Sequence, residues 1–356
     1  MGTAPDQQFF GRSVEEGPGG GASEDGDPLD RAHMTRAIAL AALVRSTTAP
    51  NPWVGSVVVP AGDGPPFEGS TTPPGGPHAE VVALAAATAA GRARGATLYS
   101  TLEPCAHHGR TAPCTDAIIE AGIARAVIGV SDPDPKVSGR GIEALRAAGI
   151  AVSVGVAASE VVEQLAPYLK HRRTGRPWVV LKLAATLDGR TAAPDGSSRW
   201  ITGEAARADA HRLRADSDAV LVGAATVRAD DPELTARLEP EPVRQPLRVV
   251  LGQAAADARV QPAIELSGDL GGVLDELGGR GVIQVLVEGG ASVAHQFHRA
   301  GLVDRYVLYL APAFLGGDDG RPVFSGPGAV TMSDVWRGRL VSVARLGDDI
   351  RVEVAA

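Results

Sequence analysis

Three residues of the types that bind zinc occur in an order that is typical of a catalytic metal site. His78 is followed by Glu80, and Cys105 and Cys114, the only two cysteines of the chain, lie downstream. One imidazole and two thiolates supply three ligands to zinc, which leaves the fourth tetrahedral position open to water. Glu80 is too close in sequence to His78 to be an independent ligand, but it is well placed to move protons beside the metal.

The pattern His-x-Glu followed by Pro-Cys resembles the signature of zinc-dependent nucleobase deaminases, except that eight residues separate the cysteines instead of two. The cysteines could also be buried as small hydrophobic residues or form a disulfide. A disulfide is disfavoured because the N-terminus has no basic segment followed by an apolar one that would direct export, and disulfides are rare in reducing compartments. His78 and Cys114 each follow a proline and precede an apolar helical run, so both are expected at helix N-termini, which favour anionic ligands.

The composition is typical of a globular protein with two domains. The chain has 356 residues, of which 44% are hydrophobic and 21% charged, and this length is comfortable for two domains. The net charge of −8 argues against a general nucleic-acid binder, which would carry a basic face, and no apolar stretch is long enough to cross a membrane. We therefore expect a cytoplasmic protein with no membrane or nucleic-acid partner. Residues 1–29 are acidic and rich in glycine, and we expect this tail to be disordered.

Helical and extended patterns alternate beyond the tail, which predicts α/β layers. Asp30 is expected to cap the first helix, which continues to Val44. The zinc motif falls at the start of a helix over 81–89, the end of a strand over 97–101 and the start of a helix over 115–121. The other predicted elements of this half are strands over 55–59, 126–130 and 151–156 and helices over 141–148 and 159–171.

A basic stretch that contains glycine and proline, residues 170–177, marks the expected domain boundary. We therefore predict a first domain over 30–173 and a second over 177–356. The second half again alternates, with predicted strands over 178–184, 219–222, 248–251, 282–287 and 305–310 and helices over 203–214 and 291–299. The last two segments, 340–345 and 349–354, are predicted to form an antiparallel pair that closes the sheet.

Polar and glycine-rich segments at predicted strand ends indicate a second ligand site. Glu288-Gly289-Gly290 joins a strand to a helix start, where exposed N–H groups bind phosphate, although one Gly-Gly turn is a weak signal. The fingerprint G-x-G-x-x-G is absent, so a dinucleotide would bind here in another fold. Residues 182–190, 197–202 and 226–235 are rich in hydrogen-bonding groups at positions where α/β proteins place ligands. Turn capping would explain Asp230 or Asp231 equally well.

Over nearly all of residues 30–356 the chain resembles the family of bifunctional riboflavin biosynthesis proteins, in which a pyrimidine deaminase is fused to a reductase. The resemblance rests on residues 51–55, 77–80, 101–114 and 132–135 and on the C-terminal segments named above. It implies a cytidine-deaminase-like α/β/α sandwich followed by a dihydrofolate-reductase-like α/β domain. It also implies deamination of 2,5-diamino-6-ribosylamino-4(3H)-pyrimidinone 5′-phosphate and NADPH-dependent reduction of its ribosyl side chain, which gives 5-amino-6-ribitylamino-uracil 5′-phosphate.

The resemblance also implies roles for individual residues. Zinc would be held by His78, Cys105 and Cys114, with Glu80 as the catalytic acid–base. Substrate would be bound in the deaminase half by Asn51 and Arg110 and in the reductase half by Lys182, Ser198, Arg214, Leu234, Arg237 and Glu288. NADPH would lie against Ala184, Trp200, Thr226, Asp230 and Gly290. Family members commonly assemble, so we expect a homo-oligomer that acts on a small phosphorylated pyrimidine.

The chain departs from the family in the reductase half. Gly252-Gln253 stands where the family has an aspartate and a small hydroxyl residue, and a strand-loop unit is expected to be missing between Leu251 and Val282. The shortening favours, as an alternative, a specialised deaminase with a degenerate reductase domain. A nucleic-acid-editing deaminase would need aromatic residues for base stacking, and these make up only 4% of the chain. A metal-stabilised binding module is the remaining alternative.

Overall fold

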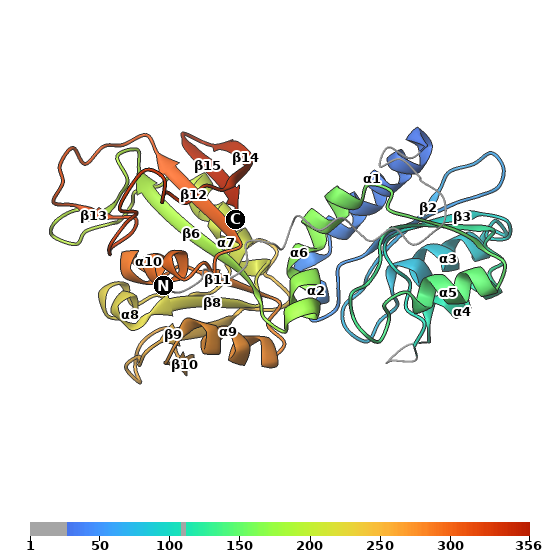
Figure 1. The fold of residues 1–356 in the computed structure, drawn as a ribbon, viewed down its shortest axis with the longest axis horizontal. Helices are drawn as coiled ribbons and strands as arrows, with labels where there is room; N and C mark the ends of the chain where they lie inside the picture. The colour runs from blue at the N-terminus through green and yellow to red at the C-terminus, as the bar shows by residue number, and fades with distance from the viewer. Residues whose placement is uncertain (1–26, 108–111) are drawn as a thin grey trace.

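The computed structural model describes residues 27–107 and 112–356, which form two lobes (Figure 1). Each lobe is built on its own sheet, and the helix α6 (Ala158–Thr174) runs from the first lobe to the second. The predicted tail, except for its last three residues, lies outside the described residues.

Five strands form the sheet of the N-terminal lobe, in the order β2-β1-β3-β4-β5. β1 pairs antiparallel with β2 and β3, whereas β3, β4 and β5 are parallel. Parallel neighbours require crossover connections, and here these are helices that cover the sheet. The strands are β1 (Gly55–Val59), β2 (Phe67–Ser70), β3 (Thr97–Leu102), β4 (Arg125–Val130) and β5 (Ala151–Val154).

Helices cover both faces of this sheet, so the lobe is the predicted α/β/α sandwich. Met34 and Leu165, from α1 and α6, pack on the face that carries Val57. Leu84, from α3, packs on the opposite face, which carries Val58. Successive strand residues point to opposite faces, so adjacent valines serve separate cores. The other helices are α1 (Pro28–Ala42), α2 (Arg45–Thr48), α3 (Ala79–Ala89), α4 (Cys114–Glu120) and α5 (Arg140–Ala147).

Eight strands form the sheet of the C-terminal lobe, in the order β10-β9-β8-β11-β6-β12-β15-β14. The first six are parallel, and β15 and β14 form an antiparallel pair at one edge, as the sequence predicts. The strands are β6 (Trp178–Thr186), β8 (Ala219–Gly223), β9 (Leu247–Leu251), β10 (Ile264–Leu266), β11 (Gln284–Val287), β12 (Arg305–Ala311), β14 (Arg339–Leu346) and β15 (Asp349–Ala355). β7 (Arg190–Ala192) and β13 (Arg321–Pro322) form a separate two-stranded ladder.

Helices also cover both faces of the larger sheet. α9 (Leu270–Gly279) and α10 (Ala291–Arg299) pack on one face, where Phe297 is fully buried. α7 (Glu204–Ala215) and α8 (Ala224–Asp230) pack on the other, where Tyr309 is buried. This arrangement is the second α/β domain expected from the sequence.

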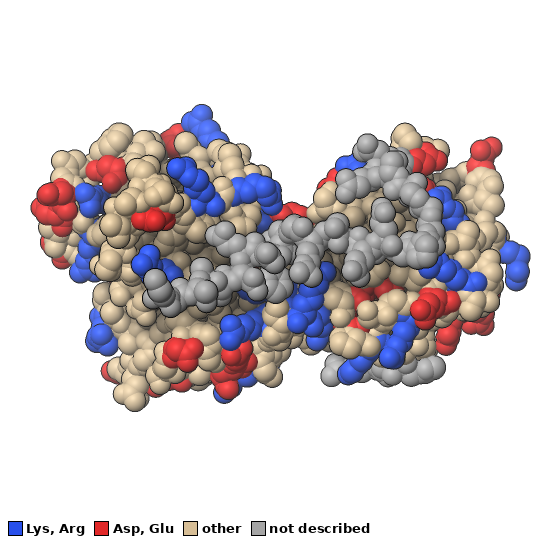
Figure 2. All heavy atoms as spheres, viewed as in Figure 1, with Lys and Arg blue, Asp and Glu red and all other residues tan. Residues whose placement is uncertain are grey.

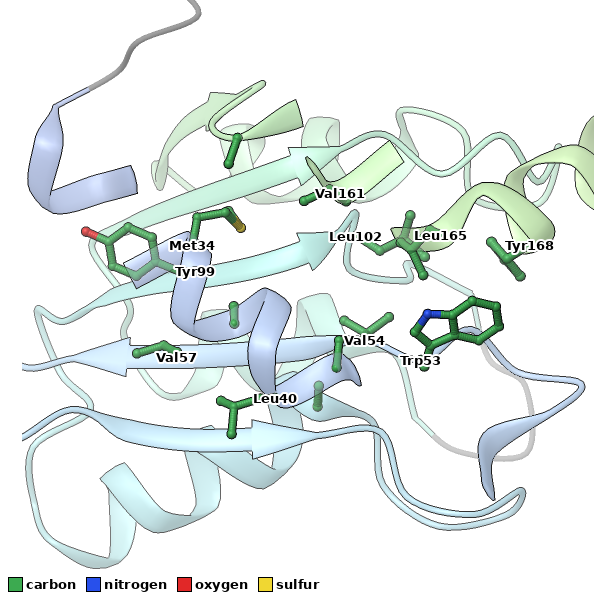
Figure 3. Close-up of a cluster of buried hydrophobic side chains, with 14 of the residues drawn as sticks. Met34, Leu40, Trp53, Val54, Val57, Tyr99, Leu102, Val161, Leu165 and Tyr168 are labelled. Atoms are coloured by element: carbon green, nitrogen blue, oxygen red, sulfur yellow. The ribbon is translucent and has the colours of Figure 1, made fainter. Parts of the chain in front are cut away.

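α6 completes the core of the first lobe and connects it to the second. Figure 3 shows Leu165 and Tyr168 of α6 close to Trp53, and the Trp53 indole donates to the carbonyl oxygen of Gln164 at 3.2 Å. Ile283, which precedes β11 in the second lobe, belongs to the same apolar cluster. The two lobes therefore share buried apolar surface.

The first helix begins earlier than the sequence predicts. Its N-cap is Asp27, whose side chain accepts the N–H of Leu29 at 3.0 Å. Asp30, the predicted cap, is instead a buried helical residue that pairs with Arg125 at 2.6 Å. Asp30, in the first turn of α1, therefore forms a tertiary ion pair, and Asp27 caps the N-terminus of the helix instead.

The strand expected to be missing between Leu251 and Val282 is present, so that prediction is wrong. β10 pairs parallel with β9, and α9 follows it. The Asp269 side chain caps α9 by accepting the N–H of Gly272 at 2.9 Å. The unit is short in sequence, but the sheet keeps its edge strand and its covering helix.

None of the described helices is both long and apolar enough to cross a membrane. Lys, Arg, Asp and Glu are interspersed over the coloured part of the face drawn in Figure 2.

Candidate active sites

His78, Cys105 and Cys114 converge at one point of the N-terminal lobe. His78 is the N-cap residue of α3, Cys114 is the first residue of α4, and Cys105 lies in the loop after β3. The Nδ1 atom of His78 lies 3.2 Å from the Sγ atom of Cys114 and 3.6 Å from that of Cys105. All three candidate ligand atoms lie within 4.8 Å of one another.

These separations fit one tetrahedral zinc ion. Zinc bonds of about 2.3 Å to sulfur and about 2.0 Å to nitrogen place neighbouring ligand atoms about 3.5 Å apart. The chemistry of the two thiols agrees with this. A hydrogen bond from Cys114 lowers the pKa of Cys105, and that bond together with burial raises the pKa of Cys114. A divalent cation bound between the two sulfurs would hold both as thiolates, because metal binding deprotonates thiols.

Glu80 lies beside this cluster, in the first turn of α3, and only 4% of its surface is exposed. Burial raises its pKa to about 7. A carboxyl group that titrates near neutrality can accept a proton in one step and return it in the next. The geometry therefore suits the acid–base role expected from the sequence.

The structure says less about the two residues of this half that were predicted to bind substrate. Asn51 lies half-buried in the loop between α2 and β1, and its N–H donates to the carbonyl oxygen of Thr48 at 2.9 Å. Arg110 lies outside the described residues. Their contact with substrate stays a prediction.

A cavity of 520 Å³ in the C-terminal lobe brings together six of the predicted reductase residues. They come from three separate stretches of the chain, and the cavity is large enough for a small ligand. The six residues are Ser198, Trp200, Arg214, Asp230, Leu234 and Arg237. Trp200 is 70% exposed, and the guanidinium groups of Arg199 and Arg207 lie 5.9 and 4.6 Å from the centre of its ring.

A buried charge cluster connects to this cavity through Arg214. The Arg214 guanidinium donates two hydrogen bonds to Glu288, at 2.6 and 3.0 Å, and Lys182 lies 3.8 Å from the same carboxylate. Burial alone would raise the pKa of Glu288, but Arg214 and Lys182 outweigh it and lower the pKa to about 2. Two cations and one carboxylate leave a net positive charge, which suits an anionic ligand.

Three predicted cofactor residues lie near strand ends of the larger sheet. Ala184 is near the carboxyl end of β6, Gly290 follows β11, and Thr226 is in the first turn of α8. Gly290 is the N-cap residue of α10, and its N–H donates to the Thr226 hydroxyl at 3.2 Å. The absence of a side chain at Gly289 lets Val293 approach, since a Cβ there would lie 2.5 Å from the Cβ of Val293. The glycine turn therefore lies at a strand end, as expected for a ligand site in an α/β sheet.

Four more residues line the 520 Å³ cavity, and one of them lies outside the segments that the sequence indicated. Arg199, Asp231 and Glu233 belong to the predicted ligand segments 197–202 and 226–235, whereas Arg259 does not. Arg259 lies in the segment from which we expected a strand-loop unit to be missing, and its guanidinium pairs with Glu233. No short motif surrounds Arg259; tertiary contacts place it at the cavity, since its N–H also donates to the Asp231 carboxylate at 2.8 Å. Near the zinc ligands, sequence reasoning assigned no role to Glu103, a buried glutamate two residues before Cys105.

Two family models match the chain, one over each lobe. The model of the cytidine and deoxycytidylate deaminase zinc-binding region matches residues 28–130. The model of the RibD C-terminal domain matches residues 177–352.

Curated relatives match almost the whole chain. The riboflavin biosynthesis protein RibD of Escherichia coli is 40% identical over 362 residues, covering 90% of this chain and 98% of that protein. The protein of the same name from Mycobacterium tuberculosis is 43% identical over 325 residues, covering 88% and 93%.

Two solved structures are similar to this chain over most of its length. RibD from Acinetobacter baumannii superposes with a TM-score of 0.85 at 37% identity, covering 92% of this chain and 98% of the other. A diaminohydroxyphosphoribosylaminopyrimidine deaminase/5-amino-6-(5-phosphoribosylamino)uracil reductase from Thermotoga maritima has a TM-score of 0.83 at 37% identity, with the same coverage.

Proposed function

This chain belongs to the RibD family of riboflavin biosynthesis proteins, and from this premise we propose how its residues divide the family's two reactions. It is a bifunctional enzyme with a zinc-dependent deaminase and an NADPH-dependent reductase. The deaminase occupies residues 30–173 and the reductase residues 177–356. The substrate is 2,5-diamino-6-ribosylamino-4(3H)-pyrimidinone 5′-phosphate, and the product of the two steps is 5-amino-6-ribitylamino-uracil 5′-phosphate.

In the deaminase, His78, Cys105 and Cys114 hold zinc. The chemistry that zinc supplies is to lower the pKa of a water molecule toward neutrality, so that it can attack the amidine carbon of the pyrimidine. Glu80 would accept one proton of that water and give it to the ring nitrogen, and then carry the remaining hydroxyl proton to the amino group, which leaves as ammonia while the carbonyl forms. Asn51 holds the pyrimidine ring by hydrogen bonds, and Arg110 holds the phosphate.

In the reductase, NADPH would supply a hydride to C1′ of the ribosyl group, and the ring oxygen would take up a proton from solvent as its bond to C1′ breaks, which leaves the open ribityl chain. Lys182, Arg214 and Glu288 bind the sugar and phosphate of the substrate, and the fixed ion pairs of Glu288 keep the two cations oriented. Ser198, Leu234 and Arg237 complete the substrate site. Ala184, Trp200, Thr226, Asp230 and the turn at Gly290 bind the cofactor.

The exposed edge of the larger sheet supports the proposal that the enzyme is a homo-oligomer. β14 is the terminal strand in the sheet order, and Leu340 and Val343 on it are 60% and 59% exposed. Met332, in the preceding segment, is 75% exposed. An apolar strand edge is a template for pairing with another strand, and a second copy of the same edge is self-complementary about a two-fold axis. We place the enzyme in the cytoplasm.

The observation that carries the deaminase proposal is the convergence of one histidine and two cysteines beside a buried glutamate. The test is to incubate the purified chain with the diaminopyrimidinone phosphate, with and without NADPH. We expect ammonia release in both cases and loss of NADPH absorbance only when substrate is present. Ammonia release without NADPH consumption would contradict the reductase assignment, and absence of both would contradict the whole proposal.

A further inference from the structure

Glu103 lies between β3 and the zinc ligand Cys105, and its carboxyl group accepts an unusually large number of backbone hydrogen bonds. It is 3% exposed, and its two carboxyl oxygens accept four backbone N–H groups. Oε1 accepts the N–H of Gly141 at 2.9 Å and of Ile142 at 3.3 Å. Oε2 accepts those of Asp132 at 3.2 Å and Gly139 at 3.1 Å.

Three of these donors belong to the N-terminus of α5. Its N-cap residue is Gly139, which has no side chain with which to cap the helix. The first N–H groups of a helix have no partner within the helix, and a side-chain oxygen on the N-cap residue usually satisfies one of them. Here Glu103 supplies that cap from a distant part of the sequence, so α5 and the loop after β3 are connected through one carboxyl group.

The loop and the helix are also in van der Waals contact next to this group. A Cβ atom on Gly141 would lie 2.0 Å from the carbonyl oxygen of Pro104. Only glycine therefore allows α5 to approach the peptide that joins Pro104 to Cys105. The carbonyl oxygen of Cys105 in turn accepts the N–H of Thr115 at 3.2 Å, in the first turn of α4.

We propose that Glu103 is a positioning residue of the zinc centre, which fixes the loop of Cys105 on α5 so that its sulfur stays within reach of His78 and Cys114. This proposal rests on the zinc ligands named under the proposed function. At its other end the loop is held by α4, since the Cys105 carbonyl oxygen accepts the N–H of Thr115 and the Cys105 sulfur accepts the N–H of Cys114 at 3.4 Å. Groups that orient a metal ligand contribute to metal affinity without touching the metal.

Glu103→Gln tests the proposal, because it keeps the shape of the side chain but replaces one acceptor oxygen by an N–H₂ donor that faces backbone N–H groups. We expect zinc affinity to fall about 10- to 100-fold. In protein loaded with Co²⁺, we expect the visible absorption bands of the thiolate-bound ion to shift or weaken. Excess zinc should restore the turnover number of the deaminase while its KM stays unchanged, which a damaged substrate pocket would not allow.

The same chain provides the controls. Glu143→Gln makes the same chemical change at an exposed position of α5 and should leave zinc affinity and the cobalt spectrum unchanged. Reductase activity should be normal in both variants. Gly141→Ala keeps the Glu103 carboxyl group but crowds both the Pro104 carbonyl oxygen, at 2.0 Å, and Glu103 Oε1, at 3.2 Å, and it should weaken zinc binding in the same direction.

Wild-type zinc affinity and an unaltered cobalt spectrum in Glu103→Gln would overturn the proposal. Loss of reductase activity together with zinc would also overturn it, since Glu103 would then serve the stability of the whole chain. If the wild-type protein itself bound no zinc, the proposed function would have failed and the role of Glu103 at the zinc centre with it, whereas weak zinc binding in Glu103→Gln alone concerns only Glu103.

Discussion

At the scale of single residues, the chemistry of each lobe depends on a buried charge held by a few neighbours. Glu80 is buried next to two sulfurs, and Glu288 is buried between Arg214 and Lys182. Both carboxyl groups have strongly shifted pKa values, in opposite directions, because burial raises the pKa of Glu80 whereas Arg214 and Lys182 outweigh burial at Glu288. The two sites can therefore be tested separately by single substitutions.

Glu80→Gln removes the proposed proton carrier and keeps the volume of the side chain. We expect the rate of ammonia release to fall by about 10²- to 10⁴-fold, with zinc still bound at one ion per chain. Ammonia release can be measured by an enzyme-coupled assay and zinc by atomic absorption. Glu120→Gln, at an exposed position of α4, serves as the control. Deamination by Glu80→Gln at the wild-type rate would show that another group moves the proton.

Glu288 links the stability of the reductase lobe to pH. Its pKa is lowered from 4.5 to about 2, so its ion pairs stabilise the fold above pH 4.5 and this contribution is lost as the pH falls toward about 2. Glu288→Gln should cost about 3 kcal/mol at neutral pH, because it leaves two buried cations without their partner. Urea unfolding at several pH values measures both effects.

Glu276→Gln is the matched control for that experiment. Glu276 pairs with Arg280 on the surface of α9, with both side chains about half exposed, and such a pair contributes about 0.5 kcal/mol or less. If the unfolding free energies of wild type and Glu288→Gln decreased in parallel between pH 5 and pH 3 (about the range set by the shift), the ion-pair account would be wrong.

The sequence predicted the residues that do chemistry better than the residues that position them. His78, Cys105 and Cys114 were predicted as zinc ligands because few other roles require those residue types in that order, and the structure brings them together. Glu103 is part of the same motif, but a glutamate in a loop has many possible partners. Its four N–H donors come from segments about 30–40 residues away, and only the fold brings these together.

At the scale of helices and strands, the long amphipathic and β-branched segments were predicted well, whereas short or glycine-rich ones were missed. β1 and α10 have the predicted bounds. α9 contains four glycines in ten residues, which lowers its intrinsic helix propensity. It forms because Asp269 caps it and because Leu274 and Leu277 are buried against the sheet. Whether such a helix forms depends on tertiary packing, which a local sequence pattern does not show.

Glycine also controls how closely α3, which carries His78 and Glu80, lies to the sheet. A Cβ atom on Gly69 of β2 would lie 2.3 Å from the carbonyl oxygen of Ala79. Gly69→Ala should therefore push α3 outward and destabilise the lobe by about 1–3 kcal/mol. Thermal unfolding measures this change. Gly62→Ala, where a Cβ would meet nothing within 4 Å, should be neutral, and equal melting temperatures for the two variants would contradict the packing argument.

At the scale of the whole molecule, the two lobes are joined by buried polar contacts as well as by α6. Lys170 of α6 pairs with Asp304 at 2.5 Å, and the same Asp304 oxygen accepts the N–H of Val179 at 2.7 Å. Arg45 of the first lobe donates to the Gln284 side chain of the second at 2.5 Å. The fixed arrangement of the lobes leaves the outer edge of the larger sheet exposed.

Introducing negative charge on β14, at the outer edge of the larger sheet, should prevent the proposed association between copies of the chain. We expect the double substitution Leu340→Glu with Val343→Glu to reduce the mass of the particle in light scattering by at least about half, because like charges facing each other across a strand pair repel. Leu43→Glu, at an exposed leucine in the other lobe, should leave the mass unchanged. An unchanged mass in the double variant would place the interface elsewhere or indicate a monomer.

The predicted domain boundary, residues 170–177, is ordered and anchored to the second lobe, which determines how it responds to proteases. α6 continues to Thr174, the Arg176 guanidinium donates two hydrogen bonds to Asp275, and the carbonyl oxygen of Gly175 fills the space where Gly278 has no side chain. Proteases cut chain that is locally unfolded, and ordered backbone resists them. Trypsin should therefore leave the native protein uncut between residues 170 and 177 despite the run of basic residues there, and mass spectrometry of a brief digest would detect a cut that contradicts this.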